Sequence, residues 1–177
     1  MQLERYPHAY VQYLIHFHGD RDYFECHEIL EHYWKEHLDH PMRETWVALI
    51  QAAVGMYHYR RGNVSGALKS LQGAIAKSQP EHLAQLGIDD REWLGRLERV
   101  VALLQGNPPA QYEDIHIPFS DIEFEKYARQ LCQDSGFEWG KPSNMNDPNL
   151  IHRHTLRDRS EVIEERRLAI QQRQAEQ

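Results

Sequence analysis

The sequence contains little cysteine and no long apolar run. Its two cysteines, Cys26 and Cys132, stand far apart in a chain of 177 residues, which excludes a disulfide framework and a paired-cysteine zinc site and indicates a reducing compartment. No apolar stretch approaches the roughly 20 residues that span a bilayer, and the first residues lack the apolar core of a secretory signal. We therefore expect a cytoplasmic protein with no membrane partner.

Positive charge is also scarce. The chain has 20 basic and 27 acidic residues, which gives a formal net charge of −7. Sequence-independent binding to a phosphate backbone needs a basic face, so nucleic acid is not an expected partner. Apolar residues make up 41% of the chain and charged residues 27%, which is typical of a globular protein and excludes a disordered one.

The chain lacks any sustained alternation of apolar and polar residues, so no strands are expected. Apolar residues instead recur every three or four positions, the period of an α-helix. Together with capping residues and breakers, this period predicts core helices at about 7–18, from Asp20 or Asp22 to Pro41, and at 44–61, 64–78 and 90–104. The predicted fold is all-α, a compact bundle of about five core helices with a C-terminal helical extension.

The character of the sequence changes after Gln105, which predicts three parts. Residues 1–105 form the helical core, and residues 106–150 are rich in loops with one helix near 120–134. Residues 151–177 are helical but strongly charged, and their thin apolar stripe consists of Leu156, Val162, Ile163, Leu168 and Ile170. A helix that buries so little is marginal alone. We expect it to dock on a protein partner or a second copy of the chain, or else to remain an exposed tail.

Histidine is frequent, with 12 in the chain, but its spacing fits no common metal motif. A zinc protease needs His-Glu-x-x-His, and the residue four after His27 is Glu31, not histidine. His27 and His32 are five apart, about 140° around a helix axis. The Glu-x-x-His pattern of di-iron bundles occurs only at Glu113 and His116, in a loop beside a proline. A metalloprotease or di-iron protein is therefore not expected.

The second predicted helix carries two ionisable groups on the face that should meet the core. His27 and Glu31 share a stripe with three apolar residues, Phe24, Leu30 and Trp34. Such groups are costly inside a protein unless they find polar partners. Gln51 and His58, two turns apart on one side of the third helix, are the candidate partners.

Two interpretations of this polar set remain open. In the first, His27 and Glu31 form a buried, purely structural pair that fixes helix packing. In the second, His27, Glu28, Glu31, Gln51 and His58 line a pocket that binds a small ligand or a divalent metal, with His27, Glu31 and His58 as candidate metal ligands. If the protein were a hydrolase, a glutamate would act as general base on metal-bound water.

Several runs of residues resemble a known family. These runs are residues 19–34, GDRDYFECHEILEHYW, then 49–53, LIQAA, followed by His58 and residues 62–67, GNVSGA. They are similar to the signature of the domain-of-unknown-function family 309, and the second half of the chain resembles an extension found in a Bacillus-type branch. The family motif carries over onto Tyr23, Phe24, His27, Glu28, Glu31, Trp34, Gln51, His58, Gly62, Asn63, Gly66 and Ala67.

The resemblance implies a compact all-helical fold and a bacterial cytoplasmic protein, but no reaction. Two functional hypotheses therefore stand side by side. The first is a non-enzymatic interaction or structural module whose C-terminal helix contacts a partner or a second copy. The alternative is a small metal- or ligand-binding protein, or a hydrolase-like enzyme, that uses a pocket of His27, Glu28, Glu31 and His58.

Overall fold

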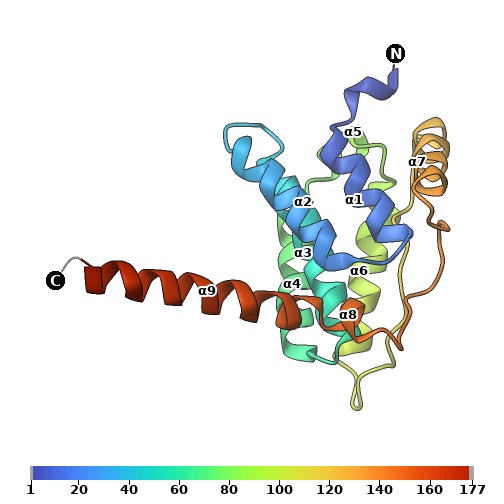
Figure 1. Cartoon of the computed structure of the whole chain (residues 1–177). Helices are drawn as coiled ribbons and strands as arrows, with labels where there is room; N and C mark the ends of the chain where they lie inside the picture. Colours follow the sequence, from blue (N-terminus) through green and yellow to red (C-terminus); the bar gives the residue numbers. More distant parts are fainter. Residues whose placement is uncertain (1, 176–177) are drawn as a thin grey trace. The chain divides into compact units, whose positions relative to one another are not determined.

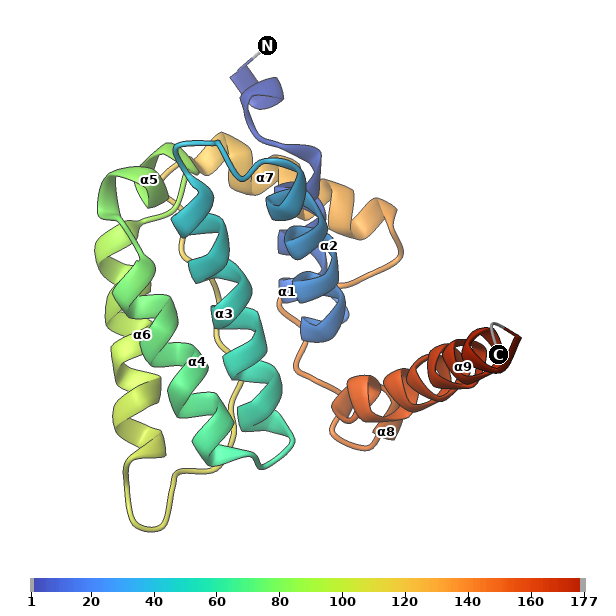
Figure 2. The same ribbon diagram turned by 90° about the vertical axis from the view of Figure 1, so that its left-hand side faces the viewer.

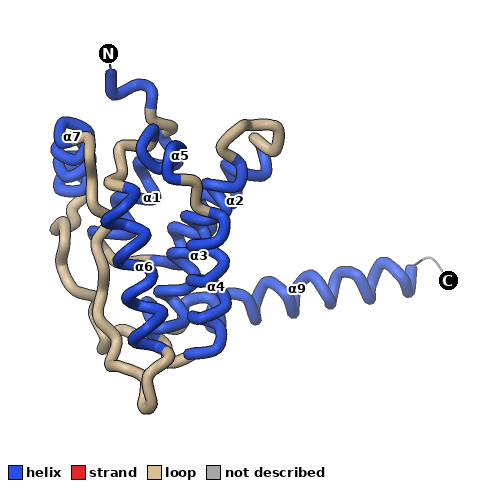
Figure 3. The backbone as a smooth tube through the Cα atoms, turned by 180° about the vertical axis from the view of Figure 1, so that it is seen from behind, coloured by secondary structure: helices blue, strands red, loops and turns tan. Residues whose placement is uncertain are grey.

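The computed structural model describes residues 2–175, and the side chains of all of these except residues 2, 3, 157–163 and 165. By its internal contacts the chain forms two compact units, Met1–Ser143 and Asn144–Gln177. The regular elements of the described residues are all helices (Figure 3). One isolated bridge joins Ile88 to Phe119. The all-α fold that the sequence predicts is therefore confirmed.

The five expected core helices are present in the first unit. They are α1 (His8–His18), α2 (Tyr23–Glu36), α3 (Arg43–Arg60), α4 (Val64–Lys77) and α6 (Asp90–Leu104). They pack in succession, α1 on α2, α2 on α3, α3 on α4 and α4 on α6 (Figures 1 and 2). Helix α7 (Ile122–Asp134) covers α1 on its other side. Trp93 of α6 also meets Phe17 of α1, with ring centroids 6.2 Å apart, so the helices close around a common core.

Three short helices lie where the sequence predicts bends or loops, or makes no prediction. They are η1 (Gln2–Arg5), α5 (Pro80–Gln85) and α8 (Pro148–Ile151). Pro80 and Pro148 stand at the first helical position, where the missing N–H has no helical partner in any case. Helix α5 lies between the predicted helices 64–78 and 90–104, and α8 lies in the segment predicted to be rich in loops.

Side-chain caps define where four of the longer helices begin. An aspartate or asparagine precedes each of them, and its oxygen accepts from a backbone N–H three residues later at 3.0–3.1 Å. These caps satisfy donors that a helix leaves without an internal partner. They are Asp22 before α2, Asn63 before α4, Asp89 before α6 and Asp121 before α7.

Aromatic side chains fill the core of the first unit. Tyr10 and Tyr13 of α1 are fully buried, and each donates its hydroxyl proton to a backbone oxygen, of Leu86 at 2.8 Å and of Leu49 at 2.7 Å. Such bonds let a tyrosine occupy an apolar interior without an unsatisfied hydroxyl. These hydrogen bonds join α1 to α3 and to the end of α5, and so fix the positions of these helices relative to one another.

The second unit consists of α8 and α9 (Arg153–Ala175). Of the predicted apolar stripe, Leu156, Leu168 and Ile170 are about half exposed, while the side chains of Val162 and Ile163 lie outside those that the structure describes. The three-part division predicted above follows composition, whereas the two units follow contacts. Among the described residues, no helix is both long and apolar enough to cross a membrane.

Candidate functional site

The predicted His27–Glu31 pair forms, but not inside the core. His27 Nε2 lies 2.6 Å from Glu31 Oε2, and the two side chains are 27% and 31% exposed. Lys35 Nζ contacts the other Glu31 oxygen at 2.9 Å. The buried positions of α2 are Tyr23, Cys26 and Leu30. The prediction of a core-facing, buried pair is therefore wrong, because the buried stripe lies to one side of the expected one.

Helix geometry explains the displacement. Neighbouring positions on a helix point about 100° apart, so a stripe centred on Cys26 leaves His27 at its edge. The Phe24 ring occupies the same flank, 5.8 Å from the His27 ring and 6.2 Å from the Tyr57 ring of α3. The pair therefore borders the α2–α3 seam and remains accessible to solvent.

The other three members of the predicted pocket each contact different groups. Glu28 is exposed, with one oxygen 3.8 Å from His27 Nδ1. Gln51 turns towards α4, where its side-chain oxygen accepts from Lys77 Nζ at 3.5 Å. His58 lies near the end of α3, and its Nδ1 accepts from Arg61 Nε at 3.1 Å. Across the described side chains, no three His, Cys, Asp or Glu residues gather closely enough to hold a metal ion.

A polar network centred on Asp114 is more deeply built than the predicted pocket. Its carboxylate accepts from the hydroxyls of Tyr23 at 2.7 Å, of Ser143 at 2.6 Å and of Tyr112, and from the Ser143 N–H at 2.6 Å. Burial alone would raise the pKa of Asp114, but the hydrogen bonds from Ser143, Tyr112 and Tyr23 outweigh it and lower the pKa below its ordinary value. Asp114 is therefore held as a carboxylate.

Two buried arginines extend this network. Arg60, 4% exposed, donates to the Arg21 carbonyl at 2.7 Å and to the Ser143 hydroxyl at 3.0 Å, and its guanidinium lies 4.6 Å from the centre of the Tyr23 ring. Arg21, 1% exposed, donates to the carbonyls of Phe17, Ile115 and Lys141. Its own backbone has φ of 59°, a left-handed conformation that is unusual for arginine. Together these bonds fasten the 110–143 region to α1, α2 and α3.

His18 fixes the same region at a second point. Its Nδ1 lies 3.0 Å from the Leu14 carbonyl, and its Nε2 accepts from the Ile117 N–H at 2.9 Å, which defines a neutral ring protonated at Nδ1. The Trp139 ring stacks on it with centroids 4.1 Å apart. Burial lowers the pKa of His18 well below its ordinary value. This histidine is an anchor and not a proton donor to a ligand.

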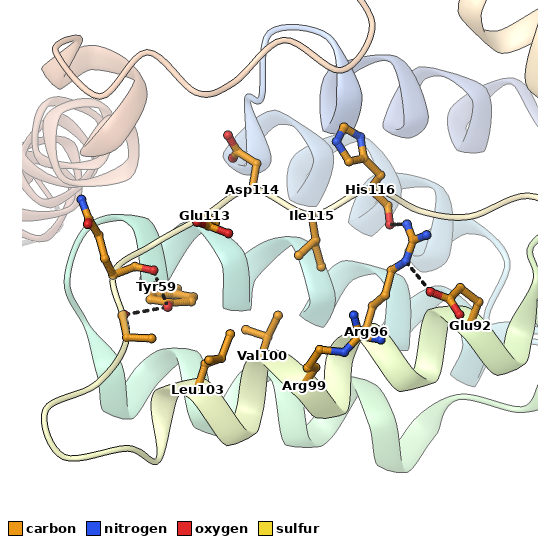
Figure 4. A pocket seen from close by; sticks show the side chains of 12 residues that line it. Tyr59, Glu92, Arg96, Arg99, Val100, Leu103, Glu113, Asp114, Ile115 and His116 are labelled. Atoms are coloured by element: carbon orange, nitrogen blue, oxygen red, sulfur yellow. Dashed lines mark hydrogen bonds and ion pairs between the residues drawn. The ribbon is translucent and has the colours of Figure 1, made fainter.

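A groove of the first unit lies between α6 and residues 110–116 (Figure 4). It encloses about 600 Å³, within the range of ligand sites. Its walls are mixed in character: Val100, Leu103 and Ile115 are apolar, and the charged or polar members are Tyr59, Glu92, Arg96, Arg99, Gln111, Glu113, Asp114 and His116. None of the five residues of the predicted pocket lines this groove.

The sequence gives little signal for either the network or the groove. Arg21 falls inside the first run that resembles the family, but nothing local distinguishes it from a surface arginine. Tyr23 and Asp114 are 91 positions apart, and Asp114 stands in a loop without periodicity. Glu113 and His116 attract notice only as an incomplete metal pattern. An alignment that showed invariant Arg21, Arg60 and Asp114 would be the signal needed.

Comparison with known proteins gives two matches. Residues 10–70 match the model of a family described as Domain of unknown function (DUF309). Over 170 residues the chain is 41% identical to YpuF, an uncharacterised protein of Bacillus subtilis (strain 168), and the alignment covers 95% of this chain and 97% of that protein. No solved structure gives a significant match.

Proposed function

This chain belongs to the DUF309 family, whose description names no activity, and from its structure we propose that it is a non-enzymatic interaction module that pairs with a second copy of itself through α9. Membership confirms the resemblance seen in the sequence. We place the protein in the bacterial cytoplasm, a placement supported by its two free, buried cysteines. Neither nucleic acid nor a membrane is part of the proposal.

The observation that carries the proposal is an apolar face on an otherwise charged helix. Leu156 and Ile170 are 55% and 56% exposed, and at a separation of 14 residues they lie within about 40° of each other around the helix axis. Such a face gains free energy when another surface covers it. A helix with so few apolar residues is marginal without that cover.

Charge favours a second copy as the occupant. Residues 153–175 contain six arginines and four acidic residues, whereas residues 1–152 contain 14 basic and 22 acidic residues. The helix is therefore weakly basic and the rest of the chain acidic. Opposite charges steer two copies together and set their register, more than they add affinity. The α9 of one copy thus complements the body of the other.

The mass of the full chain in solution tests the proposal. Light scattering after gel filtration should give the dimer mass at about 0.1 M salt, and association should weaken at about 0.5 M because charges are screened. The double variant Leu156→Glu, Ile170→Glu should be monomeric. Leu168→Glu is the matched control: Leu168 is 47% exposed, and although it belongs to the apolar stripe predicted from the sequence, it lies about 120° from Leu156 around the helix axis. Its replacement should leave the dimer intact.

Either of two results would reject self-pairing through α9. One is a wild-type monomer at the highest concentration that stays in solution. The other is a double variant that keeps the dimer mass, which would place the interface elsewhere.

The second candidate function is ligand or metal binding at His27, Glu28, Glu31 and His58. It is supported by the close and accessible His27–Glu31 contact described above. Elemental analysis of untagged protein, after incubation with zinc, manganese and iron(II), tests it against the His27→Ala and His58→Ala variants. One ion per chain in the wild type and none in either variant would favour this candidate. Equal, substoichiometric metal in all three would dismiss it.

A further inference from the structure

The chain segment that forms one wall of the large groove does not use its main-chain donors. Within the part of the chain that the structure describes, the N–H groups of residues 111–116 donate no hydrogen bond. The segment is fastened on either side of this run, where Ala110 N–H donates to the Leu103 carbonyl and Ile117 N–H to His18. Backbone donors in folded proteins are nearly always paired with protein or water. Because successive N–H groups of an uncoiled segment point to opposite sides, about three of these donors share one side and can bind a single added chain.

Side chains, and not a neighbouring strand, hold this segment in place. Tyr59 donates to the carbonyls of Ala110 and Gln111, at 2.7 and 3.1 Å. The Ile115 carbonyl accepts from Arg21 and the His116 carbonyl from Arg96, each at 2.8 Å. A fixed, uncoiled segment with free N–H groups has the properties of an exposed sheet edge, onto which an extended chain can add.

The facing wall supplies side-chain contacts of two kinds. Val100 and Leu103 project from α6 towards Ile115 in the apolar middle of the groove (Figure 4). Arg96 is already engaged, through Nε to Glu92 at 3.1 Å and through Nη1 to the His116 carbonyl. Arg99, one turn further along α6, forms no ion pair or hydrogen bond among the described residues. A guanidinium in that position suits a carboxylate.

We propose that this groove, here called the α6 groove, binds an extended peptide segment of a partner protein. The peptide adds its main chain to residues 111–116, places an apolar side chain between Val100 and Ile115, and directs an acidic side chain to Arg99. Main-chain pairing provides affinity in such complexes, and the side-chain pockets provide specificity. This binding site is separate from the α9 face, so a single chain serves two contacts.

The test starts from a phage library of random octapeptides selected on the full-length protein, with counter-selection on the Arg99→Glu variant. Selected peptides are then synthesised and their Kd values measured by fluorescence anisotropy. We expect an aspartate or glutamate next to an apolar residue, and a loss of about tenfold or more in affinity with Arg99→Glu. Arg91→Glu is the matched control, because Arg91 is an exposed arginine of α6 outside the groove, and it should change Kd less than twofold.

Two further measurements separate main-chain pairing from a side-chain contact alone. N-methylation of the peptide at alternate residues should abolish binding in one register and spare it in the other, because only alternate N–H groups face the pairing strand. Hydrogen exchange of alternate amides among residues 111–116 should slow by about tenfold or more when peptide is bound, because only those amides face the peptide. Thermal melting of Arg99→Glu and Arg99→Gln guards against loss of fold.

The proposal is overturned if no peptide is enriched on wild type over Arg99→Glu. It is also overturned if the selected peptides bind equally to both proteins, or tolerate N-methylation in both registers. Competition by inorganic phosphate or acetate alone, as effective as competition by the peptide itself, would show a small-anion site in place of a peptide groove.

Discussion

At the scale of the residue, we expect the Asp114 carboxylate to make a large contribution to the free energy of unfolding. Asp114→Ala removes the acceptor of four hydrogen bonds, so the Tyr23 hydroxyl and the Ser143 N–H and hydroxyl lose their acceptor, while Tyr112 keeps the Tyr23 hydroxyl 3.0 Å away. We expect the free energy of unfolding in urea to fall by roughly 2–4 kcal/mol. Glu113→Ala, next to it and exposed, should change it by less than about 0.5 kcal/mol.

The pH dependence of that effect has a defined sign. The pKa of Asp114 is lowered in the folded state. Its carboxylate therefore contributes fully to the free energy of unfolding above about pH 4, the pKa in the unfolded chain, and that contribution is lost as the pH falls through the folded pKa. The stability gap between wild type and Asp114→Ala should therefore narrow in strong acid. A constant gap down to that range would contradict the assignment.

His18 makes a second pH prediction, near neutrality. Its folded pKa is depressed by burial, so below about pH 6.5 the unfolded chain binds a proton that the folded ring rejects, and stability falls with pH. Urea unfolding at pH 7.5 and pH 5.5 measures this loss. His18→Gln should be less stable at pH 7.5 but lose less between the two pH values. His116→Gln should reduce the change in unfolding free energy between the two pH values by less than His18→Gln does, because the His116 ring is more exposed than that of His18.

Single residues also show where sequence reasoning succeeds and fails. The contact between His27 and Glu31 follows from their separation of four, which is a local property of a helix. Whether that pair faces the core depends on the rotation of α2 against α3, which the periodicity of α2 alone does not determine. The Asp114 network joins residues 91 and 29 positions apart, and no local pattern encodes such a meeting.

At the scale of the element, alanine substitutions at two helical glycines should change stability in opposite directions. A Cβ at Gly55 of α3 would lie 2.6 Å from Leu71 Cγ of α4, so Gly55→Ala should force the two helices apart and destabilise by roughly 1–3 kcal/mol. A Cβ at Gly95 of α6 would meet nothing within 4 Å. Gly95→Ala should therefore stabilise by about 0.5–1 kcal/mol through helix propensity.

Thermal and urea unfolding of the two alanine variants measure this difference directly. Equal effects would mean that the α3–α4 contact at Gly55 is loose enough to absorb a methyl group. Stabilisation by both would show that helix propensity outweighs packing at this seam.

Helix positions were the most predictable feature of the molecule, because period, caps and breakers are all local. Asp22, one of the two cap candidates in the sequence, accepts a cap bond in the structure, and Asn63 and Asp89 stand directly before predicted helices and cap them. The two helices that begin with proline were missed because proline stops one helix and starts another with equal ease. The course of residues 110–143 depends on buried anchors such as Arg21, and so it could not be read from propensity.

At the scale of the whole molecule, we expect the first unit to supply nearly all of the stability of the fold. The described apolar cluster runs from Tyr6 to Trp139 and lies within the first unit. We therefore expect that deletion of residues 147–177 leaves that unit folded, with a midpoint of thermal unfolding within about 3 °C of the full chain measured as a monomer at high salt. Ending the chain at Asn146 keeps Ser143, whose N–H and hydroxyl bind Asp114, away from the new terminal carboxylate.

The same truncated chain distinguishes the two proposed contacts. It should be monomeric at every concentration, because it lacks α9, yet it should bind a peptide selected for the α6 groove with the affinity of the full chain. A truncated protein that still dimerises would assign self-pairing to the first unit. A truncated protein that unfolds would show that residues beyond 146 complete the core, and it would move the boundary between the units towards the C-terminus.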